Sequence, residues 1–329
     1  MYRNSLGCFD GFFVYRYSTP LQSNFPHSLS KPLLQIPGYK FSAERAFTYI
    51  ALFIDTYLLY LVSRKIANTS PRYSFLVVLV FYSSFYVFAV LSFYDPVLFE
   101  LMFGLIALLL INSKLKLSYA YGALAMVVAF FFKQTAIIIF VSILTYYLLN
   151  KRVKEAIGFL SIFILIVVPA IIYINGITNG GFIESVFILP ITVPKVPISI
   201  LVYLALLAIN TMFIPFLLLS LIPRAFRKLS LLNVVFIFEM LSIISLEKSG
   251  STIIYLLEPL TFTCIIGISN LERINLSKPA IAYGLFAILA IFSSFMFGYQ
   301  SWTLISYKNP ANPYIVYDSF IADINPGKS

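Results

Sequence analysis

The chain has 329 residues, of which 60% are hydrophobic and 11% charged, and its mean hydropathy is +0.92. A soluble domain is about 45–50% apolar and about 25% charged, so this composition excludes an ordinary soluble fold. The net charge of +10 is typical of Lys- and Arg-rich cytoplasmic loops and does not indicate nucleic-acid binding. One histidine and two cysteines supply no ligand set for zinc and no Cys/His nucleophile.

The first 45 residues contain neither a spanning segment nor a secretory signal. Four closely spaced prolines predict a loop with, at most, a surface-lying helix: Pro20, Pro26, Pro32 and Pro37. We therefore divide the chain into an extracytoplasmic N-terminal segment (1–45), a transmembrane helical domain (46–299) and an extracytoplasmic C-terminal tail (300–329).

Long apolar runs recur throughout the middle of the chain and predict an all-α, polytopic bundle of about ten spans. The predicted segments are 46–63, 73–92, 97–112, 119–132, 134–149, 156–174, 197–222, 229–246, 252–269 and 279–299. The segments on either side of Lys133 are each short for a span, whereas a single helix of that total length would be too long. We therefore predict two short helices or one broken helix there.

The basic residues orient these segments in the membrane. With both termini outside, thirteen Lys and Arg fall in cytoplasmic loops and three in short external loops, a clear positive-inside bias. The external three are Lys133, Lys195 and Lys248. The segment 175–196, which contains three glycines and two prolines, is expected to be an external loop lying along the surface.

Several polar residues lie at the predicted outer face. Asp95 precedes Pro96 at the start of the third segment, where it is either a helix cap or a functional acid. Lys133, followed by Gln134, is either a lysine that snorkels to the interface or a cation placed for a lipid-linked phosphate. Lys248 is a second candidate phosphate ligand just outside its span.

Acids inside predicted spans form a second group. Glu258 lies in the stretch KSGSTIIYLLEP with Tyr255 three residues earlier, on the same helical face. It is either a functional group or a structural hydrogen-bonding partner for a neighbouring helix, because a charge within a bilayer is costly. Asp55 and Glu239 lie nearer mid-span and are interpreted mainly as contacts between helices. Glu100 does not share a face with Asp95.

Four stretches in order resemble the GT-C class of polytopic glycosyltransferases, especially the prokaryotic branch related to polyprenyl-phosphate-mannose-dependent mannosyltransferases. They are RAFTYIALFIDTYLLYLVSRK (45–65), FYDPVLFELMFGLIALLLI (93–111), FFKQTAIIIFVSILTYYLL (131–149) and KSGSTIIYLLEPL (248–260). The resemblance covers most of residues 30–270. It rests on the order of the motifs and their placement on one face, since each motif alone is weak.

The resemblance implies an inverting transfer of a sugar from a polyprenyl-phosphate carrier to a glycan, lipid or protein acceptor outside the cytoplasm. It implies an acid as base and basic residues on the carrier phosphate. Asp95 matches the family's acidic turn, Lys133 and Gln134 its Lys-Gln position, and Tyr255 and Glu258 its Tyr-Leu-Leu-Glu helix. No cofactor is required; a divalent cation is compatible with this chemistry, but no residue cluster in the sequence requires one.

The chain departs from the family at its N-terminus, because it starts outside instead of with a helix that leads outward to the loop bearing the base. Asp10 is the only acid before Glu44 and is therefore the only early candidate for that base. Two explanations stay open: the family's first helix is missing from this chain, or the chain is catalytically silent. Two other functions also stay open, a transporter or lipid flippase, and a non-catalytic subunit that binds a lipid-linked glycan.

Overall fold

A computed structural model describes residues 40–82, 87, 96–188, 192, 213–221, 230–243, 253–273 and 284. Within these ranges the chain is all-α and contains no strand, which confirms the all-α part of the predicted fold class. The α-helices are α3 (Lys40–Lys65), α4 (Pro71–Tyr82), α6 (Val97–Ile111), α7 (Ser118–Phe132), α8 (Ile137–Leu149), α9 (Val153–Ile177), α10 (Gly181–Ile183), α13 (Phe213–Ser220), α14 (Leu231–Ser242) and α15 (Leu257–Arg273).

Three shorter helical turns join or extend these helices. A 3-10 helix (Gln134–Ala136) precedes α8, a π-helix (Glu184–Ile188) follows α10, and a second 3-10 helix (Ile253–Leu256) leads into α15. The predicted loop at 175–196 is wrong over most of 175–188, because α9 continues to Ile177 and, after a turn, α10 and the π-helix occupy 181–188. Gly180 makes that turn with φ +89°, a conformation that glycine adopts without steric cost.

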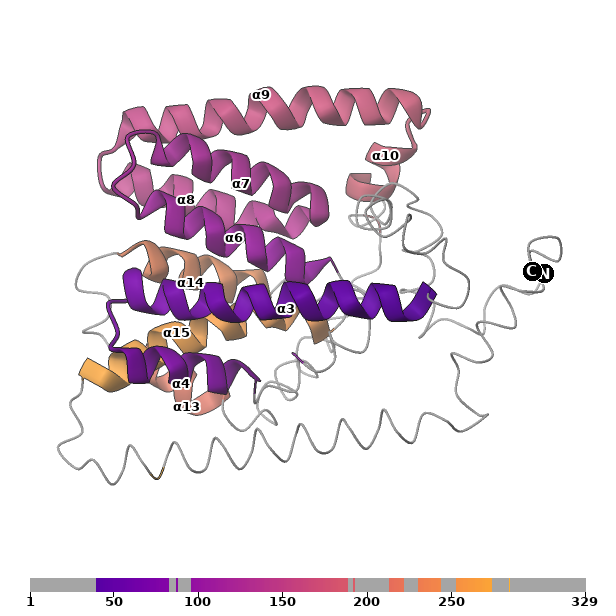
Figure 1. Cartoon of the computed structure of the whole chain (residues 1–329). Coiled ribbons are helices and arrows are strands. Elements are labelled where there is room, and N and C mark those ends of the chain that lie inside the picture. Colours follow the sequence, from indigo (N-terminus) through magenta and orange to yellow (C-terminus); the bar gives the residue numbers. More distant parts are fainter. Residues whose placement is uncertain are drawn as a thin grey trace, which may run out of the picture.

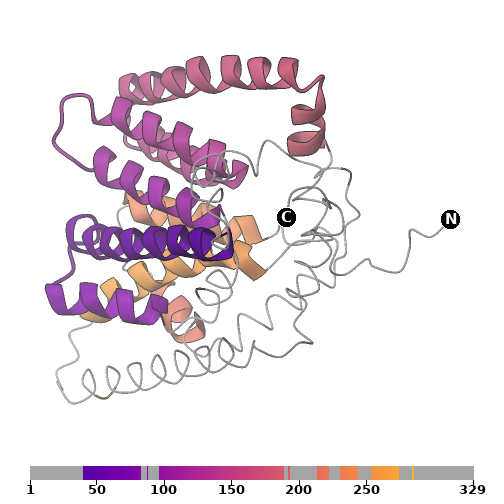
Figure 2. The same cartoon turned by 45° about the vertical axis from the view of Figure 1, so that its right-hand side comes forward.

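The helices pack side by side around one apolar core. Figure 1 shows α9 along one edge, α6, α7 and α8 next to it, then α3, α14 and α15, with α4 and α13 at the other edge; the turned view in Figure 2 keeps this order. Helix α7 packs against both α6 and α9, and α15 packs against α4, α13 and α14. The largest fully buried side chains are aromatic: Tyr147, Phe81, Phe159, Phe236 and Phe262.

Glycines allow close packing between some of these helices. A Cβ added at Gly158 of α9 would lie 2.5 Å from Cε2 of Tyr119 on α7. A Cβ at Gly122 of α7 would lie 2.7 Å from Cγ1 of Ile111 on α6. Real Cβ contacts are not this short, so these two glycines set the distance of α7 from its neighbours.

Three turns and one helix end meet at the same end of the bundle, which we call the basic end. Asn112, after α6, donates to the carbonyl of Lys65 at the end of α3 (3.2 Å). The backbone N–H of Ser70, before α4, donates to Glu272 at the end of α15 (3.0 Å). The contact of Gly158 with Tyr119 brings the start of α9 beside the start of α7. The described basic residues at this end are Arg64, Lys65, Arg72, Lys114, Lys116, Lys151, Arg152, Lys154 and Arg273.

Two described helical stretches are long and apolar enough to cross a membrane: Phe47–Lys65, within α3, and Val153–Ile177, which is α9. In the most apolar window of α9 only 17% of the residues are buried, unlike a core helix of a soluble protein. These helices indicate association with a membrane. Five further apolar helical stretches have 10–17 residues, so the number of spans stays a prediction.

Candidate functional site

Lys133 occupies the break between two helices, as predicted. The N–H of Lys133 still bonds to the carbonyl of Ala129 (3.0 Å), but its own φ and ψ, −157° and 133°, are extended and end α7. The next three residues, Gln134 to Ala136, form the 3-10 helix that starts the return through α8. The stretch is therefore a hairpin of two short helices, with Lys133 at its tip and 8% exposed.

The ammonium group of Lys133 lies over the ring of Tyr255, with Nζ 4.2 Å from the ring centroid. Tyr255 comes from the 3-10 helix that precedes α15, more than a hundred residues further along the chain. A cation over an aromatic face is attracted by the ring quadrupole, most strongly where water is excluded. Two of the predicted site residues are therefore in direct contact.

Glu258 follows in the first turn of α15 and is 4% exposed. Pro259 is tolerated beside it, because N–H groups in the first turn of a helix have no intrahelical acceptor. The carboxyl group of Glu258 interacts electrostatically with that of Glu239, which in turn interacts with Glu100. The predicted pair of Tyr255 and Glu258 thus lies at a larger polar cluster.

Glu100 and Glu239 are fully buried, and neither was among the predicted site residues. Thr135, also missed, donates a hydrogen bond from Oγ1 to Oε2 of Glu100 (2.8 Å) and so joins the hairpin tip to α6. Neither carboxylate oxygen of Glu239 has a hydrogen-bond partner among the described residues. Three carboxylates in a low-dielectric interior cannot all stay ionised without cations nearby.

We use the name polar cluster for Glu100, Lys133, Thr135, Glu239, Tyr255 and Glu258. Its members come from α6, the α7–α8 hairpin, α14 and the start of α15. Beside it, the rings of Phe99 and Phe132 stack at 4.8 Å and those of Phe103 and Phe132 at 5.7 Å. This arrangement can hold an anionic group at Lys133 and exchange protons among the acids.

The polar cluster is nearer to the basic end than the opposite ends of the long helices are. Lys133 follows the 15 residues of α7, so it stands roughly 22 Å from the basic end at about 1.5 Å per residue. Helix α9, with 25 residues, extends roughly 37 Å from the same end. The cluster therefore lies within the length that α9 spans.

Three predicted site residues, Asp10, Asp95 and Lys248, lie outside the described residues. Gln134 is half-buried in the 3-10 helix at the hairpin tip. Asp55 is buried near Tyr82, whose hydroxyl pairs with that of Thr56 (2.6 Å). Within the described ranges, no group of three or more His, Cys, Asp or Glu is arranged to hold a metal ion.

Comparison with known proteins identifies no relative. No protein-family model matches the chain, and neither a curated protein nor a solved structure matches it.

Proposed function

We propose that the chain is a multi-pass membrane glycosyltransferase that moves a sugar from a polyprenyl-phosphate carrier to an acceptor on the extracytoplasmic face. The observation that supports this most is the contact of Lys133 with Tyr255 beside Glu258. Each came from a motif that resembles the GT-C class. A shared site requires these residues to meet, and the contact of Lys133 with Tyr255 fulfils that requirement.

The proposed membrane arrangement has about ten spans, the basic end in the cytoplasm and both termini outside. Nine described Lys and Arg at the basic end support this orientation. The exposed apolar surfaces of α3 and α9, with Phe53 74% and Leu165 71% exposed, support contact with lipid tails. A hydrocarbon core is about 30 Å thick, so the polar cluster, roughly 22 Å from the basic end, would lie at the level of the outer leaflet.

That depth suits a substrate whose carrier is itself a membrane lipid. The polyprenyl chain would stay among apolar side chains while its phosphate meets Lys133. A buried lysine is a costly residue to keep, and an anionic ligand offsets part of that cost. Glu258 and Tyr255 would contact the donor around the phosphate and sugar.

In the proposed reaction, an acceptor oxygen forms a bond to the anomeric carbon as the bond from that carbon to the phosphate oxygen breaks. The acceptor's proton passes to a carboxylate base, and the polyprenyl phosphate leaves as an anion beside Lys133. Two acids are candidates for this base: Asp10, the only acid early enough for the family's base-bearing loop, and Asp95, which matches the family's acidic turn. A general base contributes typically about 10²–10⁴-fold, and a cation on the leaving phosphate stabilises charge that grows in the transition state.

The test uses the full chain in sealed vesicles with labelled polyprenyl-phosphate-linked sugars and a panel of acceptors. Wild-type protein is expected to form labelled glycoside. Lys133→Met and Glu258→Gln should lower the rate by about 100-fold or more, since oxyanion-type contacts are worth about 10²–10³-fold. Lys154→Gln, at the basic end, should leave the rate unchanged.

Other outcomes separate the competing functions. Full transfer by both site variants would remove Lys133 and Glu258 from the mechanism. Label that crosses the membrane without forming a glycoside would indicate a transporter or flippase, a function that buried acids near a helix break also support. Donor binding without transfer or transport would indicate a non-catalytic subunit.

A further inference from the structure

We propose that the turn between α8 and α9, together with the outward face of α9, binds an anionic phospholipid. This α9 lipid surface consists of Lys151, Arg152 and Lys154 and, below them, an exposed apolar stripe. The stripe residues within one leaflet of the cations are Ile157 and Leu165. The proposal concerns the opposite end of the bundle from the polar cluster and does not depend on sugar transfer.

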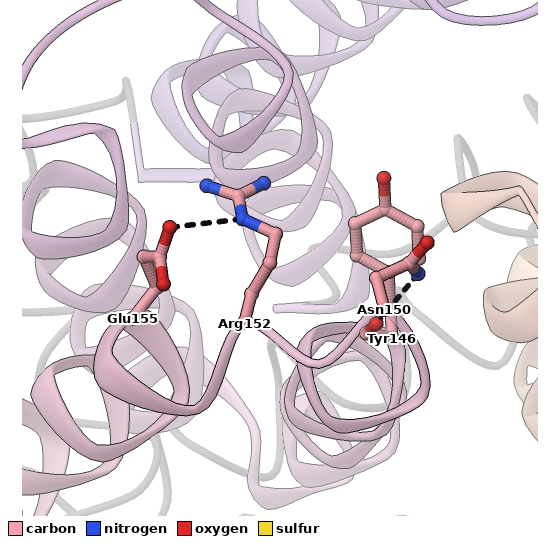
Figure 3. A network of polar contacts seen from close by, with 4 residues as sticks. All are labelled: Tyr146, Asn150, Arg152 and Glu155. Carbon is pink, nitrogen blue, oxygen red and sulfur yellow. Dashed lines mark hydrogen bonds and ion pairs between the residues drawn. The ribbon is translucent and has the colours of Figure 1, made fainter.

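The guanidinium of Arg152 is held in one orientation by two contacts. Its Nε donates to Oε1 of Glu155 at 3.0 Å, and its Cζ lies 4.9 Å from the ring centroid of Tyr147, which is fully buried. Figure 3 shows Arg152 reaching Glu155 with Nε, and the two terminal nitrogens of the guanidinium carry no dashed line. Among the described residues, none accepts a hydrogen bond from those nitrogens.

Two lysines flank this arginine and are both exposed. Lys151 has φ +59°, a left-handed conformation that costs a residue with a Cβ about 1 kcal/mol or more, and Asn150 is fixed beside it by a hydrogen bond from Nδ2 to the carbonyl of Tyr146 (2.8 Å). Within the described ranges neither lysine has an ion-pair partner. Three cations therefore share one carboxylate, Glu155, and the surface is complementary to an anion.

The cations continue directly into the apolar stripe. Lys154 and Leu165 are eleven residues apart, just over three full turns, so they lie on the same face of α9. Leu165 is 71% exposed and lies roughly 16 Å below Lys154, about the thickness of one leaflet. A phospholipid matches both parts, with its phosphate at the turn and its tails along the stripe. An acidic peptide would match only the cations.

Lipid bound at this surface can be measured with a fluorophore attached to a cysteine at position 161. The full chain carries Ser161→Cys, at an exposed position on α9, and Cys8→Ser, which removes a second labelling site. Cys264 is fully buried and stays unlabelled. The labelled protein is placed in phosphatidylcholine vesicles that contain brominated phosphatidylglycerol or brominated phosphatidylcholine at equal mole fraction. Stronger quenching by the glycerol lipid measures its local enrichment.

We expect phosphatidylglycerol to be enriched, and each neutralised cation among Lys151→Gln, Arg152→Gln and Lys154→Gln to lower the enrichment about fivefold. Arg152→Lys should lose part of it, because an ammonium lacks the planar contact with Tyr147. The matched control is Lys114→Gln with Lys116→Gln, which removes two exposed cations from another turn of the basic end and should leave the enrichment unchanged.

Equal quenching by the two brominated lipids would overturn the proposal, as would enrichment that survives in the variant with all three cations neutralised. Equal loss in the control would also overturn it, because the effect would then be general surface charge. Helical circular dichroism of each labelled variant verifies that folding is intact. Two single variants, Lys151→Gln and Lys154→Gln, retain the Arg152 contacts and keep the test decisive if Arg152→Gln fails to fold.

Discussion

The contact between Lys133 and Tyr255 can be measured by a double-mutant cycle. Lys133→Met keeps the length and most of the volume of the side chain and removes the charge. Tyr255→Leu removes the aromatic face, and Tyr255→Phe keeps it. Nζ lies 4.2 Å from the ring centroid and the lysine is 8% exposed, so the pair is in the desolvated regime, where a cation–π contact is worth about 2 kcal/mol.

The assay is unfolding of the full chain in mixed micelles by increasing denaturing detergent, followed by helical circular dichroism. We expect a coupling free energy of about 1–2 kcal/mol between Lys133→Met and Tyr255→Leu. The single change at Lys133 should cost more than this, because that residue has further interactions, and the cycle subtracts them. Tyr255→Phe should preserve most of the coupling. A coupling below about 0.5 kcal/mol, within ordinary additivity, would refute the geometry on which the functional proposal rests.

Changes at three other places test further contacts with the same assay. Gly158→Ala should destabilise the protein by about 1–3 kcal/mol, because the new methyl group would lie 2.5 Å from the Tyr119 ring. Gly176→Ala in the same helix is the control, because a Cβ added there would meet no atom within 4 Å, and it should raise the free energy of unfolding by about 0.5–1 kcal/mol. A greater loss of stability at Gly176 than at Gly158 would show that α7 and α9 do not pack this closely. Thr69→Val should cost about 1–3 kcal/mol, since its buried hydroxyl bonds to two neighbouring hydroxyls at 2.6 and 2.7 Å, and Thr69→Ser should recover most of that. Thr135→Val should cost about 1–3 kcal/mol by removing a donor from a buried carboxylate, and an unchanged midpoint would exclude that hydrogen bond.

The helices around the hairpin were predictable because local signals agree there. Apolar runs of limited length are bounded by charged or polar turns, and the predicted segments 97–112, 119–132 and 134–149 match α6, α7 and the 3-10 helix with α8 to within one residue at each end. The break at Lys133 followed from length, since one helix through it would exceed a bilayer. The start of α3 was harder to predict, because its first residues are helical but not apolar. The helix begins at Lys40, whereas the predicted apolar segment begins at residue 46.

The meeting of Lys133 with Tyr255 was predictable in part, because alternating helices place every second turn at the same end of a bundle. Connectivity alone therefore brings the tip of the hairpin and the start of α15 to one end. The presence of Glu100 and Glu239 was not predictable in this way. Their approach depends on how α6 and α14 are rotated about their axes, and that rotation is set by packing between helices distant in sequence.

Helix length explains why these buried polar groups collect where they do. Helix α7 has 15 residues and α8 has 13, whereas α3 and α9 have 26 and 25. With a longer α7, Lys133 would lie beyond the start of α15, where its ammonium group could reach water and would need no partner. Because the hairpin turns early, the lysine stays inside the bundle and must be stabilised by the Tyr255 ring and nearby groups. The shortness that makes each segment a poor spanning helix is thus the feature that brings the Lys133 ammonium to the Tyr255 ring inside the bundle.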